Sequence, residues 1–326
     1  MRTRWLGILL CVFLGCASPS EKKRAKKVDQ WMCQNDAIKV LSTTAMVNQL
    51  VRMVGGDRVD CLSLIVGNVD PHHYELVKGD REKLDCADLI VSNGVGLECG
   101  ASLRYALEHH PKTLFLGDAI FNHHPEAAIW IEGVIDPHIW MDIGLFALGI
   151  DPIVEALSQL DPAGARLYRQ RGAHLKHQME DFDRLLQQKM RTIPEEKRFL
   201  VTSHDAFHYF TRKYLAAPNE RHWAQRTLAP EGLVPDGQLS ALDIQEVCDF
   251  LCSHRLGVVF SESNVSQSAL QKVIASCREK GLDVTLASTP LYGDAMSETG
   301  DEEGAYFRMI EHNVNTLVHF LIKSES

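Results

Sequence analysis

The stretch from residue 161 to 193 constrains this chain most, because it is long, apolar at helical spacing and free of proline after its start. Asp161 and Pro162 are typical of a helix start, where proline fits the first helical position. Apolar residues then recur at steps of 4, 3, 4 and 4, at Leu175, Met179, Phe182, Leu186 and Met190. The pattern predicts about 28 helical residues, roughly 42 Å long at 1.5 Å per residue. Such a rod spans a whole lobe, so we expect it to join two domains rigidly.

On both sides of this linking helix, strand-like apolar runs alternate with helical patterns, as in layered α/β proteins. Before it we expect strands at 37–42, 58–66, 88–92 and 113–116, with helices at 44–55, 79–86 and 97–108. After it we expect strands at 198–202, 256–261 and 282–287, with helices at 240–254, 266–279 and 304–322. About 310 residues without a leader exceed what one core usually supports. The sequence therefore predicts an α/β fold with two β/α lobes, 37–160 and 194–326, joined by a long rigid backbone helix.

Three histidines and one aspartate follow strand-like runs. The tripeptide Asp-Pro-His occurs twice, ending at His72 and at His138. His138 lies 66 residues after His72, and His204 lies 66 residues after His138. Asp294 lies in a later polar loop. Strand ends of α/β proteins gather along one crevice, and imidazole with carboxylate suits Zn²⁺, Fe²⁺ or Mn²⁺. We therefore expect one divalent transition metal ion in the interlobe cleft, with two ligands from each lobe.

The N-terminus has the pattern of an exported protein. Arg2 and Arg4 precede an apolar run that ends at Gly15, which is too short to span a bilayer and is typical of a signal peptide at 1–15. Cys16 after this run fits lipidation, and Gly15-Cys16-Ala17 also fits ordinary cleavage, so both alternatives stay open. Residues 16–36, rich in lysine, are expected to form a solvated tether. We expect a periplasmic protein whose membrane contact, if any, is through a lipid at Cys16, with no later membrane span.

Composition limits the partners. Loss of residues 1–15 removes two arginines and no acid, which changes the formal net charge from −9 to −11 and argues against a nucleic-acid partner. Seven cysteines remain after Cys16, at 33, 61, 86, 99, 248, 252 and 277, and none forms a C-x-x-C pair. A thiolate zinc site is therefore not expected, and disulfide pairing is open. A monomer is the expected state.

Several segments together resemble one known family, the manganese/zinc/iron-binding solute-binding proteins of ABC transporters. The similarity runs from about residue 37 to the end and includes Asp-Pro-His-His-Tyr-Glu at 70–75, Asp-Pro-His-Ile-Trp at 136–140, Ser-His-Asp-Ala-Phe-His-Tyr-Phe at 203–210, Phe-Ser-Glu-Ser-Asn-Val-Ser at 260–266 and the Asp294 loop. Further segments at 77–80, 211–215 and 230–233 resemble most the family's chlamydial metal-binding member. The resemblance implies two lobes, a backbone helix, and metal ligands at His72, His138, His204 and Asp294.

The same resemblance implies a carrier that captures Zn, Mn or Fe and delivers it to an ABC permease, and no enzyme. Leu76 stands where the family usually has proline, and the long histidine-rich loop of many zinc-specific members is absent, which leaves the metal open. Two rival readings are a zinc-dependent hydrolase and a surface adhesin with a structural metal. Catalytic zinc usually keeps three protein ligands and one open position, and no His-Glu-x-x-His helix occurs, so the carrier is favoured.

Other residues near the motifs have smaller expected roles. Asp70, Asp136, Tyr74 and Glu75 are candidates to orient the imidazoles. His73 is expected either behind the metal ligands or in solvent, the pairs at 109–110 and 123–124 in surface loops, and His174 and His177 in solvent on the linking helix. Because the ligating histidines must be neutral, metal affinity is expected to fall below about pH 6.5.

Overall fold

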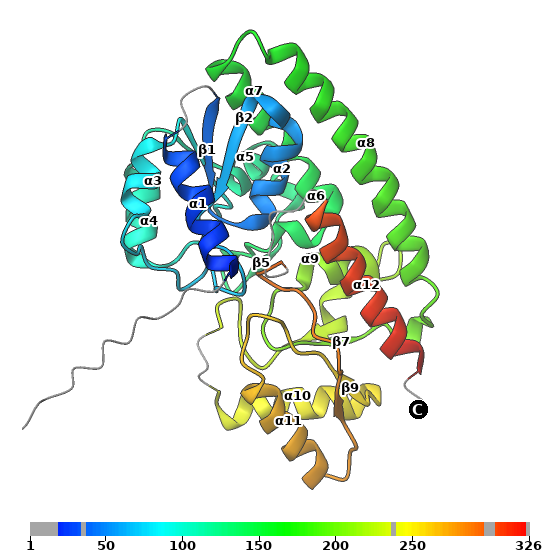
Figure 1. Cartoon of the computed structure of the whole chain (residues 1–326). Helices are drawn as coiled ribbons and strands as arrows, with labels where there is room; N and C mark the ends of the chain where they lie inside the picture. Colours follow the sequence, from blue (N-terminus) through cyan, green and yellow to red (C-terminus); the bar gives the residue numbers. More distant parts are fainter. Residues whose placement is uncertain (1–18, 34–36, 236–238, 297–303, 324–326) are drawn as a thin grey trace, which may run out of the picture.

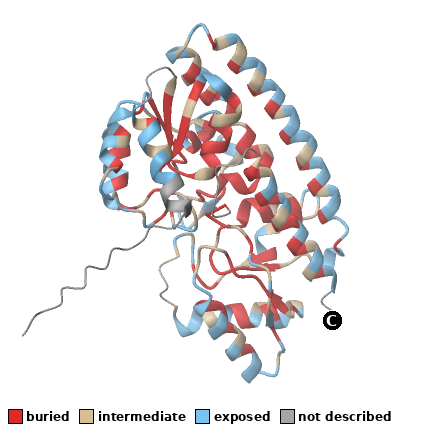
Figure 2. Cartoon of the chain, viewed as in Figure 1, coloured by how far each residue is buried: buried red, intermediate tan, exposed pale blue. Residues whose placement is uncertain are grey.

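The computed structural model describes residues 19–33, 37–235, 239–296 and 304–323. The predicted signal peptide and Cys16 lie outside the described residues. Two α/β lobes are joined by one long helix that runs along one side of both (Figure 1). Buried residues concentrate between the sheet and its helices and along the inner face of the long helix (Figure 2). The fold class predicted from the sequence is confirmed, whereas the exact division at residues 160 and 194 stays a prediction.

The first lobe is built on a parallel sheet in the order β2-β1-β3-β4. Its strands are β1 (Ile38–Ser42), β2 (Val59–Ser63), β3 (Leu89–Ser92) and β4 (Thr113–Phe115). Val40 of β1 is paired with Cys61 on one side and with Leu89 on the other. These strands lack the alternating polar pattern because helices cover both faces of the sheet. All four lie within one to three residues of the predicted strand ends.

Helices of the first lobe connect the strands and close the core. They are α2 (Ala45–Gly55), α3 (Asp80–Cys86), α4 (Ala101–His109), α5 (Leu116–His123), α6 (Ile143–Ala147) and α7 (Ile150–Leu160). Shorter elements are the 3-10 turns η1 (Gly56–Arg58), η2 (Pro125–Ala127) and η3 (Ile139–Met141) and the hairpin of β5 (Trp130–Ile131) and β6 (Val134–Ile135). Thr44 caps α2 by accepting a hydrogen bond from the backbone N of Val47.

One stretch of the described chain corrects the expectation that no later run could span a membrane. Residues Ile143–Leu160 are long and apolar enough by length and composition, and 44 % of this stretch is buried within the protein. It is divided into α6 and α7, both of which contact the long helix, and α7 also contacts α2. These contacts are those of core helices, whose apolar character serves packing.

The predicted tether differs most from expectation. Residues Pro19–Cys33 form helix α1, which lies against β2 (Figure 1). Trp31 is 1 % exposed, and its indole Nε1 donates to the carbonyl of Asp60 at 2.9 Å. Arg24 donates to the carbonyl of Leu64 at 3.2 Å. The lysine content suggested a solvated segment, but Val28, Trp31 and Met32 recur at helical spacing and pack on the first lobe.

The linking helix is α8 (Ala165–Met190), 26 residues and about 39 Å long. Its buried face, which includes Leu175, Met179 and Leu186, contacts α2, α6 and α7 of the first lobe and the last helix, α12, of the chain. Gly172 is required by close packing, because a Cβ there would lie 2.8 Å from Cγ2 of Val154 on α7. The helix is therefore packed along its length and not free to bend between the lobes.

The second lobe has short parallel strand pairs. Strand β7 (Leu200–Val201) pairs with β8 (Thr227–Leu228), and β9 (Val258–Val259) pairs with β10 (Thr285–Leu286). The backbone N of Phe260 donates to the carbonyl of Val201 at 2.9 Å, which connects the two pairs. The other elements are η4 (Glu195–Lys197), α9 (His208–Phe210), the π-helical turn η5 (Thr211–Leu215), η6 (Trp223–Arg226), α10 (Ala241–His254), α11 (Ser268–Glu279) and α12 (Ala305–Lys323).

Candidate metal centre

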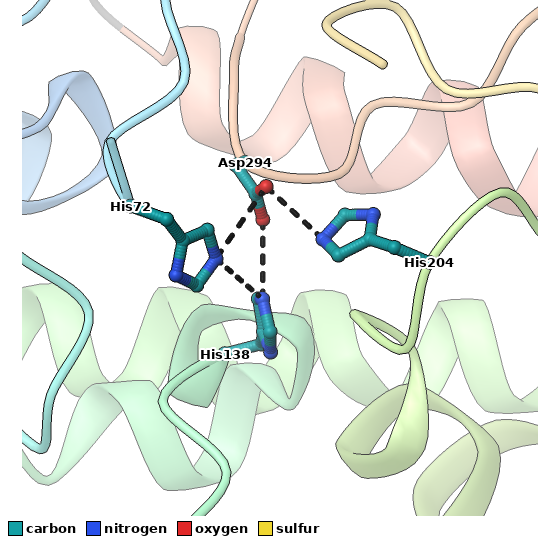
Figure 3. A group of neighbouring side chains, drawn as sticks. All are labelled: His72, His138, His204 and Asp294. Carbon is teal, nitrogen blue, oxygen red and sulfur yellow. Dashed lines mark hydrogen bonds and ion pairs between the residues drawn. The ribbon is translucent and has the colours of Figure 1, made fainter. Parts of the chain in front are cut away.

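Four side chains from four separate loops meet between the lobes. His72, His138, His204 and Asp294 each offer one ligand atom, and these atoms all lie within 4.8 Å of one another. Figure 3 shows the three imidazoles pointing toward the carboxylate of Asp294. The three histidines are 0 % exposed and Asp294 is 3 % exposed. The sequence prediction that these distant residues converge agrees with the structure.

The spacing of the donor atoms suits a single cation. Nε2 of His72 lies 3.3 Å from Nε2 of His138, and Nε2 of His204 lies 3.1 Å from Oδ2 of Asp294. Asp294 Oδ1 lies 3.3 Å from Nε2 of His138, and its Oδ2 lies 3.7 Å from Nε2 of His72. Donors bound tetrahedrally at about 2.0–2.2 Å from one ion are about 3.4 Å apart. The arrangement therefore fits three imidazole nitrogens and the carboxylate of Asp294 around a common centre.

His138 is oriented by the aspartate two residues before it. Asp136 Oδ1 lies 2.7 Å from Nδ1 of His138 and accepts a hydrogen bond from the His138 backbone N at 2.9 Å. A carboxylate bound to Nδ1 fixes the tautomer in which Nε2 is free to coordinate. Asp136 is fully buried, and its other oxygen, Oδ2, lies 3.0 Å from Nδ1 of His208 in the second lobe. Asp136 thus connects a donor of the first lobe to the second lobe.

His204 lies against the carboxylate of Glu262. Glu262 Oε2 lies 2.7 Å from Nδ1 of His204, and Glu262 Oε1 accepts hydrogen bonds from the backbone N of Ser203 at 3.1 Å and of His204 at 3.0 Å. Glu262 is 2 % exposed. One carboxylate therefore holds the backbone of this residue by hydrogen bonds and lies at ion-pair distance from its imidazole.

Asp294 and His72 are held mainly through their loops. The indole Nε1 of Trp140, in the first lobe, donates to the carbonyl of Gly293 at 3.0 Å, and a Cβ at Gly293 would collide with Glu262. A larger residue beside Asp294 would therefore push the Glu262 carboxylate away from its position against His204. The backbone N of His72 donates to Asp70 Oδ1 at 2.8 Å, whereas Nδ1 of His72 has no hydrogen-bond partner among the described residues.

Burial and neighbouring charge shift the pKa values of the four groups in different directions. Burial lowers the pKa of His138, but the charge of Asp136 outweighs this effect and raises it to about 9. Burial likewise opposes charge at His204, where Glu262 and Asp294 hold the pKa well above its usual range. Burial lowers the pKa of His72 to about 4 despite the nearby carboxylate. Burial would raise the pKa of Asp294, but the charges of His204 and His138 keep it well below its usual range.

These shifts indicate that a cation bound at this site would compete with protons. Without a metal, the protons on His138 and His204 balance the buried carboxylates that contact them. Coordination requires neutral imidazoles, so binding a divalent cation displaces these protons and restores the charge balance. Because Asp136 raises the pKa of His138, we expect proton competition at this residue to begin above the pH of about 6.5 that suits a free imidazole.

Comparison with known proteins identifies the family. Residues 40–320 match ZnuA, described as zinc-uptake complex component A, periplasmic. The chain belongs to the ZnuA family. It is 38 % identical over 322 residues to metal-binding protein YtgA of Chlamydia muridarum, covering 97 % of this chain and 94 % of the relative. It is 30 % identical over 311 residues to the manganese-binding lipoprotein MntA of Bacillus subtilis strain 168, covering 94 % of each.

Solved structures agree with this assignment. The crystal structure of Fe(III)-bound YtgA from Chlamydia trachomatis matches with a TM-score of 0.81 at 38 % identity and covers 87 % of this chain and 98 % of that one. The ZnuA family consists of periplasmic substrate-binding proteins for metals that work with ABC permeases. The family and the transport function predicted from the sequence are thus confirmed, and the rival hydrolase and adhesin readings receive no support.

Two of the four predicted orienting residues act elsewhere. The hydroxyl of Tyr74 donates to Asp80 at 2.8 Å, and Glu75 accepts hydrogen bonds from the backbone N of Ala101 and Ser102 at the start of α4. Proximity in sequence to His72 was misleading, because the side chains of Tyr74 and Glu75 contact Asp80 and the start of α4 instead of the imidazole. Asp136 was predicted correctly, and Asp70 contacts the backbone of His72 instead of its imidazole.

Glu262 and His208 were not predicted as orienting residues. Both lie in segments that resemble the family, but nothing in their local pattern indicated contact with His204 or Asp136. The His73 side chain is 53 % exposed and its Nδ1 lies 2.7 Å from Oδ2 of Asp70, whereas His174 and His177 are exposed on α8, as expected. His109 and His123 are exposed, but they are the last residues of helices α4 and α5, whereas loops were expected there.

Proposed function

We propose that this protein captures one divalent transition metal ion, zinc, manganese or iron, outside the cytoplasm and delivers it to the permease of an ABC transporter. The observation that carries the proposal is the convergence of three imidazoles and a carboxylate from both lobes on one buried point. We assign His72, His138, His204 and Asp294 as the ligands. The proposed role of the protein is binding and delivery, with the ion as cargo.

A carrier fits the donor set better than an enzyme does. A catalytic zinc site keeps a position open for water or substrate, whereas four protein donors fill a tetrahedral shell. The donors are fully buried, so a bound ion would be shielded from substrates of any size. We therefore propose that the protein has no catalytic activity.

Release is proposed to depend on separation of the lobes. Two donors come from each lobe, so even a small separation breaks the shell. The helix α8 packs against both lobes, which favours small local shifts over a wide hinge movement. Contact with the membrane permease would supply that shift. We further propose a monomer in the periplasm, held at a membrane by a lipid on Cys16.

The metal carried in the cell is not decided by affinity alone. Nitrogen and oxygen donors bind Zn²⁺ more tightly than Fe²⁺ or Mn²⁺, whatever the physiological cargo. The relatives differ in what their names state, since one is called manganese-binding and one was solved with Fe(III). Metal content of protein purified from its own host identifies the cargo.

The direct test replaces ligands and measures bound metal. His72→Ala and Asp294→Ala proteins, purified like the wild type and loaded with one equivalent of Zn²⁺, are expected to lose most of their metal on gel filtration. His174→Ala, on the exposed face of α8, is the matched control and should retain it. Metal is quantified by mass spectrometry, and circular dichroism verifies that each variant is folded. Full occupancy in either ligand variant would overturn the assignment of ligands.

A further inference from the structure

Two cysteines that the proposed metal function does not use lie against each other in the second lobe. Cys248 is on α10 and Cys277 is on α11, and these helices pack side by side (Figure 1). Their Sγ atoms are 2.9 Å apart. A disulfide bond is about 2.05 Å long, so the two sulfurs are within a small side-chain adjustment of bonding distance.

The surroundings of this pair are apolar and closed. Both cysteines are 0 % exposed and belong to one cluster with Val201, Val247, Leu251 and Val273. Burial also raises the pKa of the Cys277 thiol to about 12, so little thiolate exists in the folded protein. Because the thiolate is the reactive form, this pair would not react after folding, and a bond between the sulfurs must form while the helices are still assembling.

We propose that Cys248 and Cys277 form a structural disulfide that joins α10 to α11. The two thiols lose two protons and two electrons as the S–S bond forms, and a disulfide of a thiol oxidoreductase, reduced to its dithiol, accepts both. The supply of this oxidant rests on the extracytoplasmic location in the proposed function, because such bonds persist in the periplasm and not in the cytosol.

The second lobe has particular need of a covalent link. Its strands β7, β8, β9 and β10 have two residues each, so few ladder hydrogen bonds hold them together. The helices α10 and α11 flank strand β9, which leads to Glu262, and β10 leads to Asp294. A bond between residues 29 positions apart restricts the unfolded chain and so stabilises the lobe that carries two of the donors. The bond lies outside the metal centre, so its expected effect is on stability and not on coordination.

The experiment begins with the wild-type full chain exported to an oxidising periplasm. The protein is purified without reductant, denatured in the presence of a maleimide that blocks free thiols, digested and analysed by mass spectrometry. We expect a linked pair of peptides containing Cys248 and Cys277, and both residues free only after reduction. Recovery of both cysteines as maleimide adducts without prior reduction, or of Cys248 linked to a different cysteine, would overturn the proposal without need of any variant.

Stability provides a second measurement. The unfolding midpoint of the wild type is expected to fall on the order of 5 °C after reduction under denaturing conditions and refolding with reductant present. A Cys248→Ala/Cys277→Ala double variant should match the reduced protein and show no response to reductant. Cys252→Ser, one turn further along α10 and exposed, is the matched control and should behave like the wild type. An equal reductant response in the double variant would contradict the proposal.

A measurement of metal content distinguishes a failure of the disulfide proposal from a failure of the proposed metal function. Zinc occupancy is measured on the same samples at 25 °C, where the double variant is expected to bind as the wild type does. A missing disulfide with normal occupancy rejects only the bond, whereas a disulfide in a protein that holds no metal rejects only the metal function.

Discussion

Replacement of Glu262 by glutamine tests how the second lobe presents His204. The carboxylate accepts from two backbone N–H groups through Oε1 and faces Nδ1 of His204 through Oε2 at 2.7 Å. In Glu262→Gln, the amide oxygen can keep the two backbone hydrogen bonds only if its NH₂ group faces Nδ1. Nδ1 must then accept, so the imidazole proton moves to Nε2, the atom that points at the metal position.

The expected cost follows from this change of tautomer. Before Nε2 of His204 can coordinate the ion, its proton must move back to Nδ1, or the glutamine amide must turn so that its NH₂ group faces the two backbone N–H donors. Loss of partners that orient a ligand typically lowers metal affinity by about 10–100-fold, or about 1.4–2.8 kcal/mol. We expect a loss in this range for Zn²⁺, measured at pH 7.5 by competition with a chelating dye.

The matched control is Glu279→Gln, the same substitution at an exposed position of α11, which should leave affinity unchanged. Thermal unfolding of both variants verifies that they are folded. If Glu262→Gln is folded and binds Zn²⁺ within about twofold of the wild type, then Glu262 does not set the tautomer of His204 and the reasoning fails.

Three further predictions concern pH, packing and the first helix. Because the pKa of His138 is raised to about 9 and coordination removes its proton, Zn²⁺ affinity should fall as pH is lowered from 9 to 7. The expected fall is about tenfold per pH unit for each proton released. Equal affinity at pH 7 and 9 in competition titrations would exclude proton competition. Gly172→Ala should lower the thermal unfolding midpoint. Overpacking of the added methyl group against Val154 costs about 1–3 kcal/mol, which exceeds the gain of about 1 kcal/mol in helix propensity. An unchanged or higher midpoint in calorimetry would contradict this. Trp31→Ala should lower the free energy of unfolding, measured by urea denaturation, by about 3 kcal/mol or more. It should also speed cleavage within α1 in limited trypsin digestion. If α1 were solvated, the substitution would have neither effect.

The regular elements could be predicted because their signals are local. Apolar runs and helical spacing predicted strands β1 to β4 and helix α8 to within a few residues of the observed ends. The proline before His72 and His138 marked turns, but only His72 follows a strand of the parallel sheet, because His138 follows the antiparallel hairpin of β5 and β6. The predicted set of four donors follows from such signals together with the family resemblance.

What could not be predicted depends on contacts between distant parts of the chain. Glu262 is 58 residues from His204 in sequence, and only the folded second lobe brings it under that imidazole. His208 contacts Asp136 across 72 residues. Tyr74 shows the converse, since it follows the site closely in sequence and its hydroxyl binds Asp80 instead. For α1 the signal was present in Val28, Trp31 and Met32, but the surrounding lysines outweighed it in the prediction.

The complete burial of all four donors has a kinetic consequence. An ion bound there, as proposed, would be reached neither by water nor by a competing chelator while the two halves of the molecule stay together. Its residence time is then set by how often they part, and the strengths of the individual coordination bonds matter only during those intervals. Different metals are therefore expected to have the same maximum exchange rate, which is the rate at which the two halves of the protein separate.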